Sequence, residues 1–309
     1  MQRKLLLFGG TGFVGSHIAV RALLHGYKVV VASRTGAPLP NTPLETLYER
    51  VREVGGPRAA REALLPDAAA AGPADLDAGD ALLRMAEGVG EADALEFVSL
   101  DASSRQQVFN FMHDHPDAVG VISAVGLLTR DYHLARQMNG DTATHMAAGM
   151  CHPRLLPHAR KFVYISAEPY HRHFPYLIGH KRLLKGYFQG KRIGEEAVLK
   201  NLGDRGLVLR PGFIYGTRFV GLTTATGTGA VLALPLWLVG KPLDWLLSAV
   251  GGRRLFAPPT DVEVLAEAAV RACAWATLPD KNVSGIADVY KMKEMAAAPD
   301  PAAREAERR

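Results

Sequence analysis

The sequence predicts an α/β protein with a doubly wound parallel sheet and a small C-terminal substrate lobe. Three observations lead to this prediction. A buried strand, a glycine-rich turn and a helix follow one another at the start of the chain, and short apolar runs then alternate with helical patterns up to residue 210. The chain has 309 residues, of which 48% are hydrophobic and 22% charged, so it can bury a large core and is neither fibrous nor wholly disordered.

The first 34 residues predict a strand, a turn, a helix and a second strand. Residues 5–8 form a continuous apolar run, as in a strand that is buried on both faces. Three glycines follow over residues 9–15, and apolar residues then recur at helical spacing over 16–25 until Gly26 ends the helix. Residues 29–32 form the second apolar run, which completes a β-α-β unit.

Residues 36–94 interrupt this alternation with a stretch rich in Ala, Pro, Gly and Asp. Connections between neighbouring strands of such a sheet are normally much shorter. We interpret the stretch as a solvated surface insertion with helical pieces at 44–54 and 81–85. The alternative is an element that docks a partner.

The alternation resumes at residue 95 and continues to the lobe. The predicted strands are 95–100, 119–124, 161–166 and 206–210. The predicted helices are 105–114, 142–152, 187–199 and 262–275. Residues 230–250 are the most hydrophobic part of the chain, but two prolines, Lys241 and Asp244 interrupt them and argue against a helix that crosses a membrane.

These elements divide the chain into three parts. Residues 1–211 are predicted to form a dinucleotide-binding domain of the Rossmann type that contains the insertion, residues 212–293 the small lobe and a returning helix, and residues 294–309 a flexible tail. Lys and Arg number 36 against 31 Asp and Glu, with no dense basic block, so we expect no nucleic-acid partner. The two cysteines make neither a disulfide framework nor a metal site.

The turn after the first strand carries the glycine pattern of a dinucleotide site. Gly9 permits the tight turn, Gly12 lets phosphates approach the backbone, and Gly15 lets the helix pack on the strand. The alternative is a glycine turn kept for packing alone. Because the pattern follows a strand and opens a helix, we expect a nicotinamide dinucleotide to bind here. The predicted contacts are Gly9, Gly10, Thr11, Gly12, Phe13, Val14 and Gly15.

The end of the second strand indicates which dinucleotide binds. An acidic residue there would bind the ribose 2′-hydroxyl of NAD, but the chain has Ser33 and Arg34, which suit a 2′-phosphate. We therefore expect NADP in preference to NAD, and the alternative for Arg34 is an ordinary surface position. Asp101 follows the next strand, where it is placed either to contact the adenine or to cap a helix.

Tyr187 and Lys191 are four residues apart and share one face of a predicted helix. A neighbouring ammonium and a bound nicotinium would favour the phenolate and move the pKa of the tyrosine from about 10 toward the working pH. Lys191 would also hold the nicotinamide ribose. Ser166, at the end of a strand, would hold a substrate carbonyl against Tyr187, so these three residues are the predicted catalytic set.

Two further strand ends are expected beside the cofactor, and the alternative for the second is a plain strand stop. The expected lining residues are Ala124, Val125, Gly126, Pro211 and Gly212. Three histidines lie between residues 171 and 180. They have no adjacent cysteine or acidic partner, so we interpret this segment as a loop over the cleft rather than a metal site.

Four segments together resemble the extended branch of the short-chain dehydrogenases/reductases, with the chain as an atypical member. They are residues 9–15, 162–167, 186–192 and 209–218. The chain is similar in particular to NAD(P)-binding Rossmann proteins of plant and algal mitochondria and plastids. That group includes relatives of the dehydrogenase-like member of the coenzyme Q synthesis complex and, more distantly, the nucleotide-binding accessory subunit of respiratory complex I.

The resemblance implies an NADP(H)-binding oxidoreductase that acts on or near a hydrophobic, quinone-type substrate, with Ser166, Tyr187 and Lys191 at the family's catalytic positions. It also implies a mitochondrial location on the matrix side of the inner membrane, with plastid and cytoplasm as alternatives. Several relatives bind nucleotide as structural subunits, so a non-catalytic accessory or assembly subunit of a complex such as complex I stays open. A redox-sensing regulator would lack the tyrosine–lysine pair and ranks last.

Overall fold

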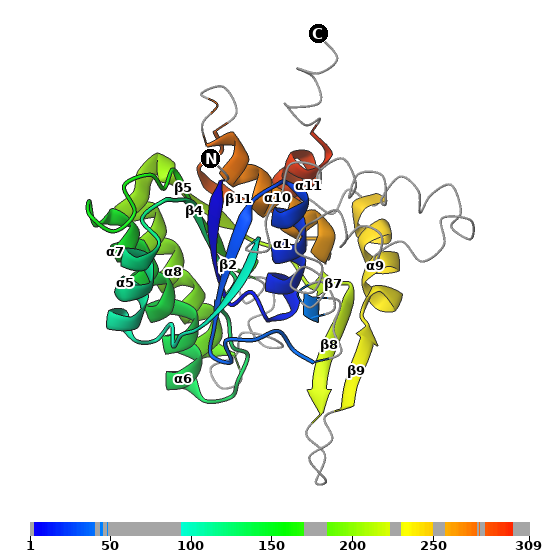
Figure 1. Cartoon of the computed structure of the whole chain (residues 1–309). Helices are drawn as coiled ribbons and strands as arrows, with labels where there is room; N and C mark the ends of the chain where they lie inside the picture. The colour runs from blue at the N-terminus through cyan, green and yellow to red at the C-terminus, as the bar shows by residue number, and fades with distance from the viewer. Residues whose placement is uncertain are drawn as a thin grey trace, which may run out of the picture.

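The computed structural model describes residues 3–40, 44, 45, 48, 94–169, 184–222, 230–249, 257–276, 278 and 282–298. At its centre lies a seven-stranded sheet in which every neighbouring pair of strands is parallel (Figure 1). The strand order is β11-β6-β5-β4-β1-β2-β3, so the direction of winding reverses between β1 and β4. This order confirms the predicted doubly wound parallel sheet.

The strands are short and apolar on both faces, which is why they appear in the sequence as continuous hydrophobic runs. In β1, Leu5 and Leu7 join the core on one side of the sheet, and Leu6 and Phe8 join the core on the other. The seven strands are β1 (Lys4–Phe8), β2 (Lys28–Ser33), β3 (Leu95–Ser99), β4 (Ala118–Ser123), β5 (Lys161–Ile165), β6 (Gly206–Leu209) and β11 (Gly285–Ala287).

Helices cover both faces of the sheet (Figure 1). One face is covered by α1 (Phe13–Leu24), α10 (Val262–Trp275) and α11 (Val289–Ala297). The other is covered by α5 (Arg105–Asp114), α7 (Thr142–Cys151) and α8 (Lys185–Leu202), and the 3-10 turn η3 (Gly203–Arg205) joins α8 to β6. Helices α5 and α10 occupy their predicted ranges, whereas α1 begins three residues earlier than predicted, inside the glycine pattern.

The sequence did not predict the helical segment that precedes α7. It consists of α6 (Tyr132–Arg136) and the π-helical turn η1 (Gln137–Asp141). The π turn lies against α8, where a Cβ on Gly140 would be 2.9 Å from Gly190 O. Two glycines therefore let this wide turn approach α8 closely, and π turns are frequent at functional sites.

The small lobe, defined here as residues 212–222, 230–249 and 257–261, projects from one side of the sheet (Figure 1). It contains the parallel pair β7 (Ile214–Tyr215) and β10 (Thr260–Asp261), the hairpin β8 (Thr217–Leu222) and β9 (Ala230–Pro235), and the helix α9 (Trp237–Ala249). The most hydrophobic stretch of the chain is thus a strand followed by a short helix. Within the described ranges, every helix is too short or too polar to cross a membrane.

Two predictions concern the C-terminal tail and the insertion at residues 36–94. The expected tail boundary at residue 294 falls inside α11, which continues to Ala297 and buries Met295, so the folded part extends further than predicted. Of the insertion, the structure describes residues 36–40, 44, 45, 48 and 94. The predicted helices at 44–54 and 81–85 otherwise lie outside the described residues.

Candidate active site

The glycine turn joins β1 to α1 and leaves no room for side chains. Gly9 has a φ of +76°, which favours glycine, and its N–H donates to Ala32 O at 2.8 Å. A Cβ on Gly15 would overlap Gly9 O, and a Cβ on Gly10 would lie 2.7 Å from Val31 Cγ1. The backbone of the turn therefore packs directly against β2 and the first turn of α1.

The N-terminus of α1 fits a diphosphate. Gly12 is the N-cap residue, no side chain caps the helix, and Ser16 N is the first amide to bond back along the helix, to Gly12 O. The amides of Phe13, Val14 and Gly15 consequently have no acceptor within the helix. Gly12 is exposed, with Thr11 partly exposed beside it. Unpaired amides at the positive end of a helix dipole bind phosphate oxygens.

Beyond the end of β2, Arg34 is exposed, and its side chain has no partner among the described residues. Its backbone is fixed, because Arg34 O accepts from Ser99 Oγ at 3.2 Å. Ser33 is buried and its hydroxyl oxygen accepts from Gly36 N at 3.2 Å. Ser33 therefore shapes the turn, while Arg34 extends its guanidinium outward from the carboxyl end of the strand.

Asp101 orders the turn before α5 and does not cap that helix. Its two carboxylate oxygens accept from Ser103 N and Ser103 Oγ, each at 2.9 Å. The N-cap of α5 is Ser104, whose hydroxyl accepts from Gln107 N. Of the two roles considered for Asp101, the structure thus assigns helix capping to a neighbour and leaves the adenine contact as a prediction.

Tyr187 and Lys191 lie together near the start of α8, at the carboxyl ends of β4 and β5. Lys191 Nζ is 5.9 Å from the centroid of the Tyr187 ring, and it donates to Val125 O at 3.1 Å and Ile165 O at 2.7 Å. Within the described part of the chain, the Tyr187 hydroxyl makes no hydrogen bond. The pair thus presents a phenol whose proton is available.

The electrostatics of this pair differ from the expectation of a lowered tyrosine pKa. Burial raises the pKa of Tyr187 to about 12. Burial also lowers the pKa of Lys191 to about 7, although the negative charge of Glu195 opposes this shift. At neutral pH the phenol therefore keeps its proton, and the amine takes up or releases one readily.

Ser166 does not direct its hydroxyl proton to the space in front of Tyr187. The residue is buried, and its Oγ donates to Glu195 Oε1 at 2.7 Å. Arg210 grips the same carboxylate with two bonds, from Nε to Oε1 at 2.8 Å and from Nη2 to Oε2 at 2.6 Å. Ser166 belongs in the structure to a network that ties β5, β6 and α8 together.

Glu195 was not singled out from the sequence. Its one available signal was its position four residues after Lys191, on the same face of α8.

Asn139 is a second residue that the sequence did not reveal. Its fully buried amide donates to Leu127 O at 2.8 Å and Ala135 O at 2.7 Å, and its Oδ1 accepts from Leu127 N at 3.2 Å. A Cβ on Gly126 would lie 3.2 Å from Asn139 Oδ1 and 3.3 Å from Lys191 Nζ. Asn139 thus fixes the loop after β4 beside the lysine, and a polar residue inside a helical pattern was its only signal.

The predicted residues after β6 form a turn that the lobe supports. Pro211 O accepts from Glu168 N, and Gly212 N donates to the buried hydroxyl of Thr260, each at 2.9 Å. The histidines between residues 171 and 180 lie outside the described residues. No group of three metal-ligating side chains occurs in the described ranges.

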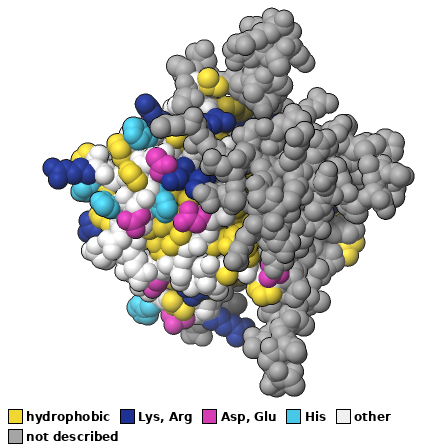
Figure 2. Space-filling view, viewed as in Figure 1, with side chains coloured by type: hydrophobic (Ala, Val, Ile, Leu, Met, Phe, Trp, Pro, Cys, Tyr) yellow, Lys and Arg dark blue, Asp and Glu magenta, His cyan; other side chains and the backbone are white. Residues whose placement is uncertain are grey.

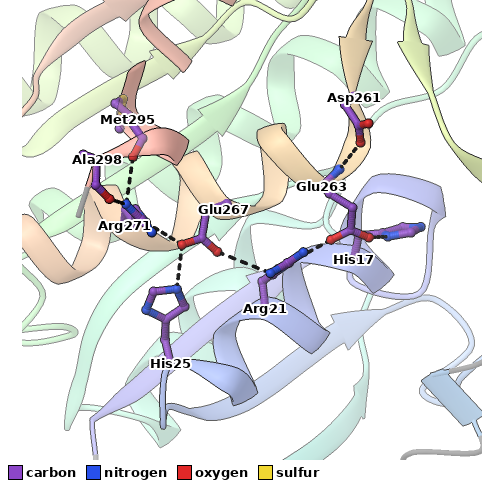
Figure 3. A network of polar contacts seen from close by, with 9 residues as sticks. All are labelled: His17, Arg21, His25, Asp261, Glu263, Glu267, Arg271, Met295 and Ala298. Carbon is purple, nitrogen blue, oxygen red and sulfur yellow. Dashed lines mark hydrogen bonds and ion pairs between the residues drawn. The ribbon is translucent and has the colours of Figure 1, made fainter. Parts of the chain in front are cut away.

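A polar network fixes α1 to α10 (Figure 3). Glu263 lies 2.5 Å from His17 Nδ1 and accepts from Arg21 at 2.7 Å. One turn further along, Glu267 bonds His25 at 2.9 Å and also binds Arg271. Burial alone would raise the pKa of Glu267, but the bonds and charges of these two partners outweigh it and lower the pKa to about 2.

Charge over the rest of the described surface is mixed. On the face in Figure 2, Lys and Arg side chains are interspersed with Asp, Glu and His. The geometry that points to a ligand is therefore the glycine turn and the tyrosine–lysine pair, which Val125 links. A Cβ on Gly9 would be 3.0 Å from Val125 N, and Val125 O accepts from Lys191.

Comparisons with known proteins agree with this geometry. The model of the NAD dependent epimerase/dehydratase family matches residues 5–228. An uncharacterized chloroplastic protein of Arabidopsis thaliana is 28% identical over 312 residues, which cover 96% of this chain and 78% of that protein.

Solved structures share the fold. A short-chain type dehydrogenase/reductase from Mycobacterium ulcerans has a TM-score of 0.52 at 14% identity, over 98% of this chain and 94% of its own. ElxO with NADP bound has 0.51 at 11% identity, over 94% and 97%. The Bordetella bronchiseptica enzyme WbmG in complex with NAD has 0.51 at 13% identity, over 94% and 73%. With the family model matching well over half of its residues, the chain belongs to the NAD dependent epimerase/dehydratase family and is an NAD(P)-binding Rossmann protein.

Proposed function

We propose that the protein is an NADP(H)-dependent reductase that donates a proton from Tyr187 to the carbonyl oxygen of a hydrophobic substrate. The observation that carries this proposal is the Tyr187 hydroxyl, which lies beside Lys191 and has no hydrogen bond among the described residues, and the Val125 backbone that connects the pair to the glycine turn. A bound dinucleotide supplies the hydride from nicotinamide C4 to the carbonyl carbon. The chain would supply the proton to the carbonyl oxygen, so the product is an alcohol; a quinone reduced in this way gives a hydroxydienone, which tautomerises to the quinol.

The pKa values favour reduction over oxidation. A phenol with a pKa of about 12 is protonated at neutral pH, so it is a proton donor and a poor base. When Tyr187 gives up its proton, a charged Lys191 nearby stabilises the phenolate, and a lysine pKa of about 7 allows that charge to form at neutral pH. Ser166 is not required in this step, because its proton is bonded to Glu195.

The test of this function is Tyr187→Phe. Oxidation of NADPH should be followed by absorbance with a panel of quinones and aldehydes as acceptors. We expect the variant to lose about 100-fold or more in turnover and to bind NADPH with an unchanged Kd, because only the proton donor is removed. Tyr132→Phe on α6 removes a hydroxyl that bonds Gln189, which lies on α8 with Tyr187. This variant should leave turnover within twofold. Equal turnover in wild type and Tyr187→Phe would refute the role of Tyr187.

The preference for NADP rests on the end of β2. Arg34 is exposed there without a partner in the described ranges, and no acid stands at the position that would bind the NAD ribose. We expect Arg34→Ala to weaken NADPH binding by about 10- to 100-fold and to leave NADH binding unchanged, as measured by titration calorimetry. Arg154→Ala, at an exposed arginine after α7, is the matched control. An equal loss for NADPH and NADH would assign Arg34 to another role.

The compartment and the substrate class are proposed from two separate observations. The Arabidopsis relative is named chloroplastic, so we place this protein in a plastid rather than, as the sequence resemblance implied, at the mitochondrial inner membrane. A quinone-type substrate is supported by Phe213, an apolar side chain that is 49% exposed directly after the Pro211–Gly212 turn.

A nucleotide-binding subunit without turnover is the second candidate function. The engagement of Ser166 by Glu195 favours it, because one member of the expected catalytic set is then structural. It predicts that wild type and Tyr187→Phe are alike in every acceptor assay and that the native protein migrates in a large assembly. A free small species in native extracts would count against it.

A further inference from the structure

Helix α9 of the small lobe exposes an apolar face. The exposed fractions are 57% for Leu238, 69% for Val239, 41% for Leu243 and 73% for Trp245. Among the described elements, the helix lies on the far side of β7 from the seven-stranded sheet (Figure 1). Single exposed hydrophobic residues are common on protein surfaces and need no explanation. Four large exposed apolar side chains on one short helix instead indicate an interaction surface.

The orientation of this face is fixed by contacts on the inner side of the helix. A Cβ on Gly240 would lie 2.7 Å from Tyr215 Cδ1, so the backbone of α9 packs directly on that ring. The Tyr215 hydroxyl donates to Asp244 Oδ2 at 3.0 Å, and Lys293 Nζ on α11 pairs with Asp244 Oδ1 at 2.7 Å. The exposed side chains therefore point outward because the opposite side of α9 is anchored.

The charges of the lobe are sorted by sign. Its described residues include two acids, and both are bonded inward: Asp244 as above, and Asp261 by capping α10 through Glu263 N at 2.9 Å. Its described bases, Arg218 and Lys241, are exposed. The outward charge of the described lobe is thus positive, and one of its two bases, Lys241, lies on the same helix as the exposed apolar side chains.

We propose that α9 lies flat on the surface of an anionic lipid bilayer. Its 13 residues span about 20 Å, shorter than the bilayer core of about 30 Å, so the helix lies in the interface plane rather than across it. Leu238, Val239 and Leu243 enter the acyl boundary, Trp245 takes the interfacial position that tryptophan favours, and Lys241 meets lipid phosphate. This inference goes beyond the proposed reductase function and does not depend on it.

A lipid surface fits the charges better than a second copy of the chain. A two-fold dimer through α9 would bring Lys241 and Arg218 of both copies toward one another. The described lobe exposes no acid that could pair with them. An anionic headgroup layer supplies that counter-charge together with an apolar layer beneath it.

The experiment is flotation of the full chain with vesicles of mixed phosphatidylcholine and phosphatidylglycerol, and with vesicles of phosphatidylcholine alone. We expect binding to the mixed vesicles, weakened by added salt. The double variant Val239→Glu/Trp245→Glu should lose about 100-fold or more in partition coefficient, since each of the two buried apolar side chains contributes about tenfold or more. Lys241→Glu should lose binding to the mixed vesicles while its apolar area stays intact.

Leu128→Glu is the matched control, because Leu128 is 65% exposed and belongs to the loop after β4 rather than to the lobe. It should bind the vesicles as wild type does. The proposal is overturned if wild type does not float, if the double variant floats equally well, or if both vesicle types bind equally. Sedimentation that shows a dimer abolished by the double variant, without vesicle binding, would assign the face to a second copy instead.

Discussion

Glu195 holds three parts of the molecule together from its place on α8. It accepts the Ser166 hydroxyl at the end of β5 and two bonds from Arg210 at the end of β6. Such a paired, buried carboxylate is stable only while its partners stay in place. A serine at the end of a strand can either orient a substrate oxygen or hold a neighbouring carboxylate. For Ser166, the bond to Glu195 indicates the structural role.

This geometry makes Ser166→Ala a decisive substitution at the scale of one residue. We expect the variant to lose about 2 kcal/mol of stability in urea unfolding, the usual loss for a hydrogen bond to a charged group, and to keep turnover within twofold. If Ser166 oriented the substrate oxygen instead, turnover would fall by about 100-fold or more. Ser103→Ala, which removes a hydroxyl bonded to Asp101, serves as a control for loss of a serine hydroxyl elsewhere.

At the scale of an element, α1 depends on the charge state of its contacts with α10. The pKa of Glu267 is lowered from 4.5 to about 2 in the folded protein. A carboxyl with a depressed folded pKa stabilises the protein above its unfolded pKa, and that stability is lost as pH falls toward the folded value. The contribution is up to about 3 kcal/mol and disappears between about pH 4.5 and 2.

Thermal unfolding measured across this pH range checks the expectation. Glu267→Gln should be less stable than wild type at pH 6, and the difference should shrink as pH approaches 2. Glu196→Gln, at an exposed position on α8, should follow the wild-type curve at every pH. A constant gap between wild type and Glu267→Gln would show that geometry rather than charge is responsible.

Elements with a regular pattern were predictable, and those made by tertiary contacts were not. Helices α5 and α10 match their predicted ranges because apolar residues recur on one face. The π turn at Gln137–Asp141 was missed, since its wide geometry is set by its close approach to α8. The glycine turn and the tyrosine–lysine pair were visible in local spacing. The Glu195–Arg210 contact joins residues from two elements and has no local signature.

At the scale of the whole molecule, a bound dinucleotide should stabilise the fold by mass action. NADPH at a hundredfold excess over its Kd should add about 2.7 kcal/mol, seen as a higher Tm. Gly15→Ala should abolish this rise, because its Cβ would overlap Gly9 O and distort the turn. Gly26→Ala, where a Cβ would meet nothing within 4 Å, should lower Tm yet keep the response to NADPH. A full response in Gly15→Ala would place the ligand elsewhere.

Helix α10 links the small lobe to helix α1. It starts directly from β10 of the lobe, where Asp261 caps it, and then bonds α1 through Glu263 and Glu267. Because α10 is one continuous helix, it connects the small lobe rigidly to α1. A change in the position of the lobe would therefore be passed on to α1, whose N-terminus is the proposed coenzyme site.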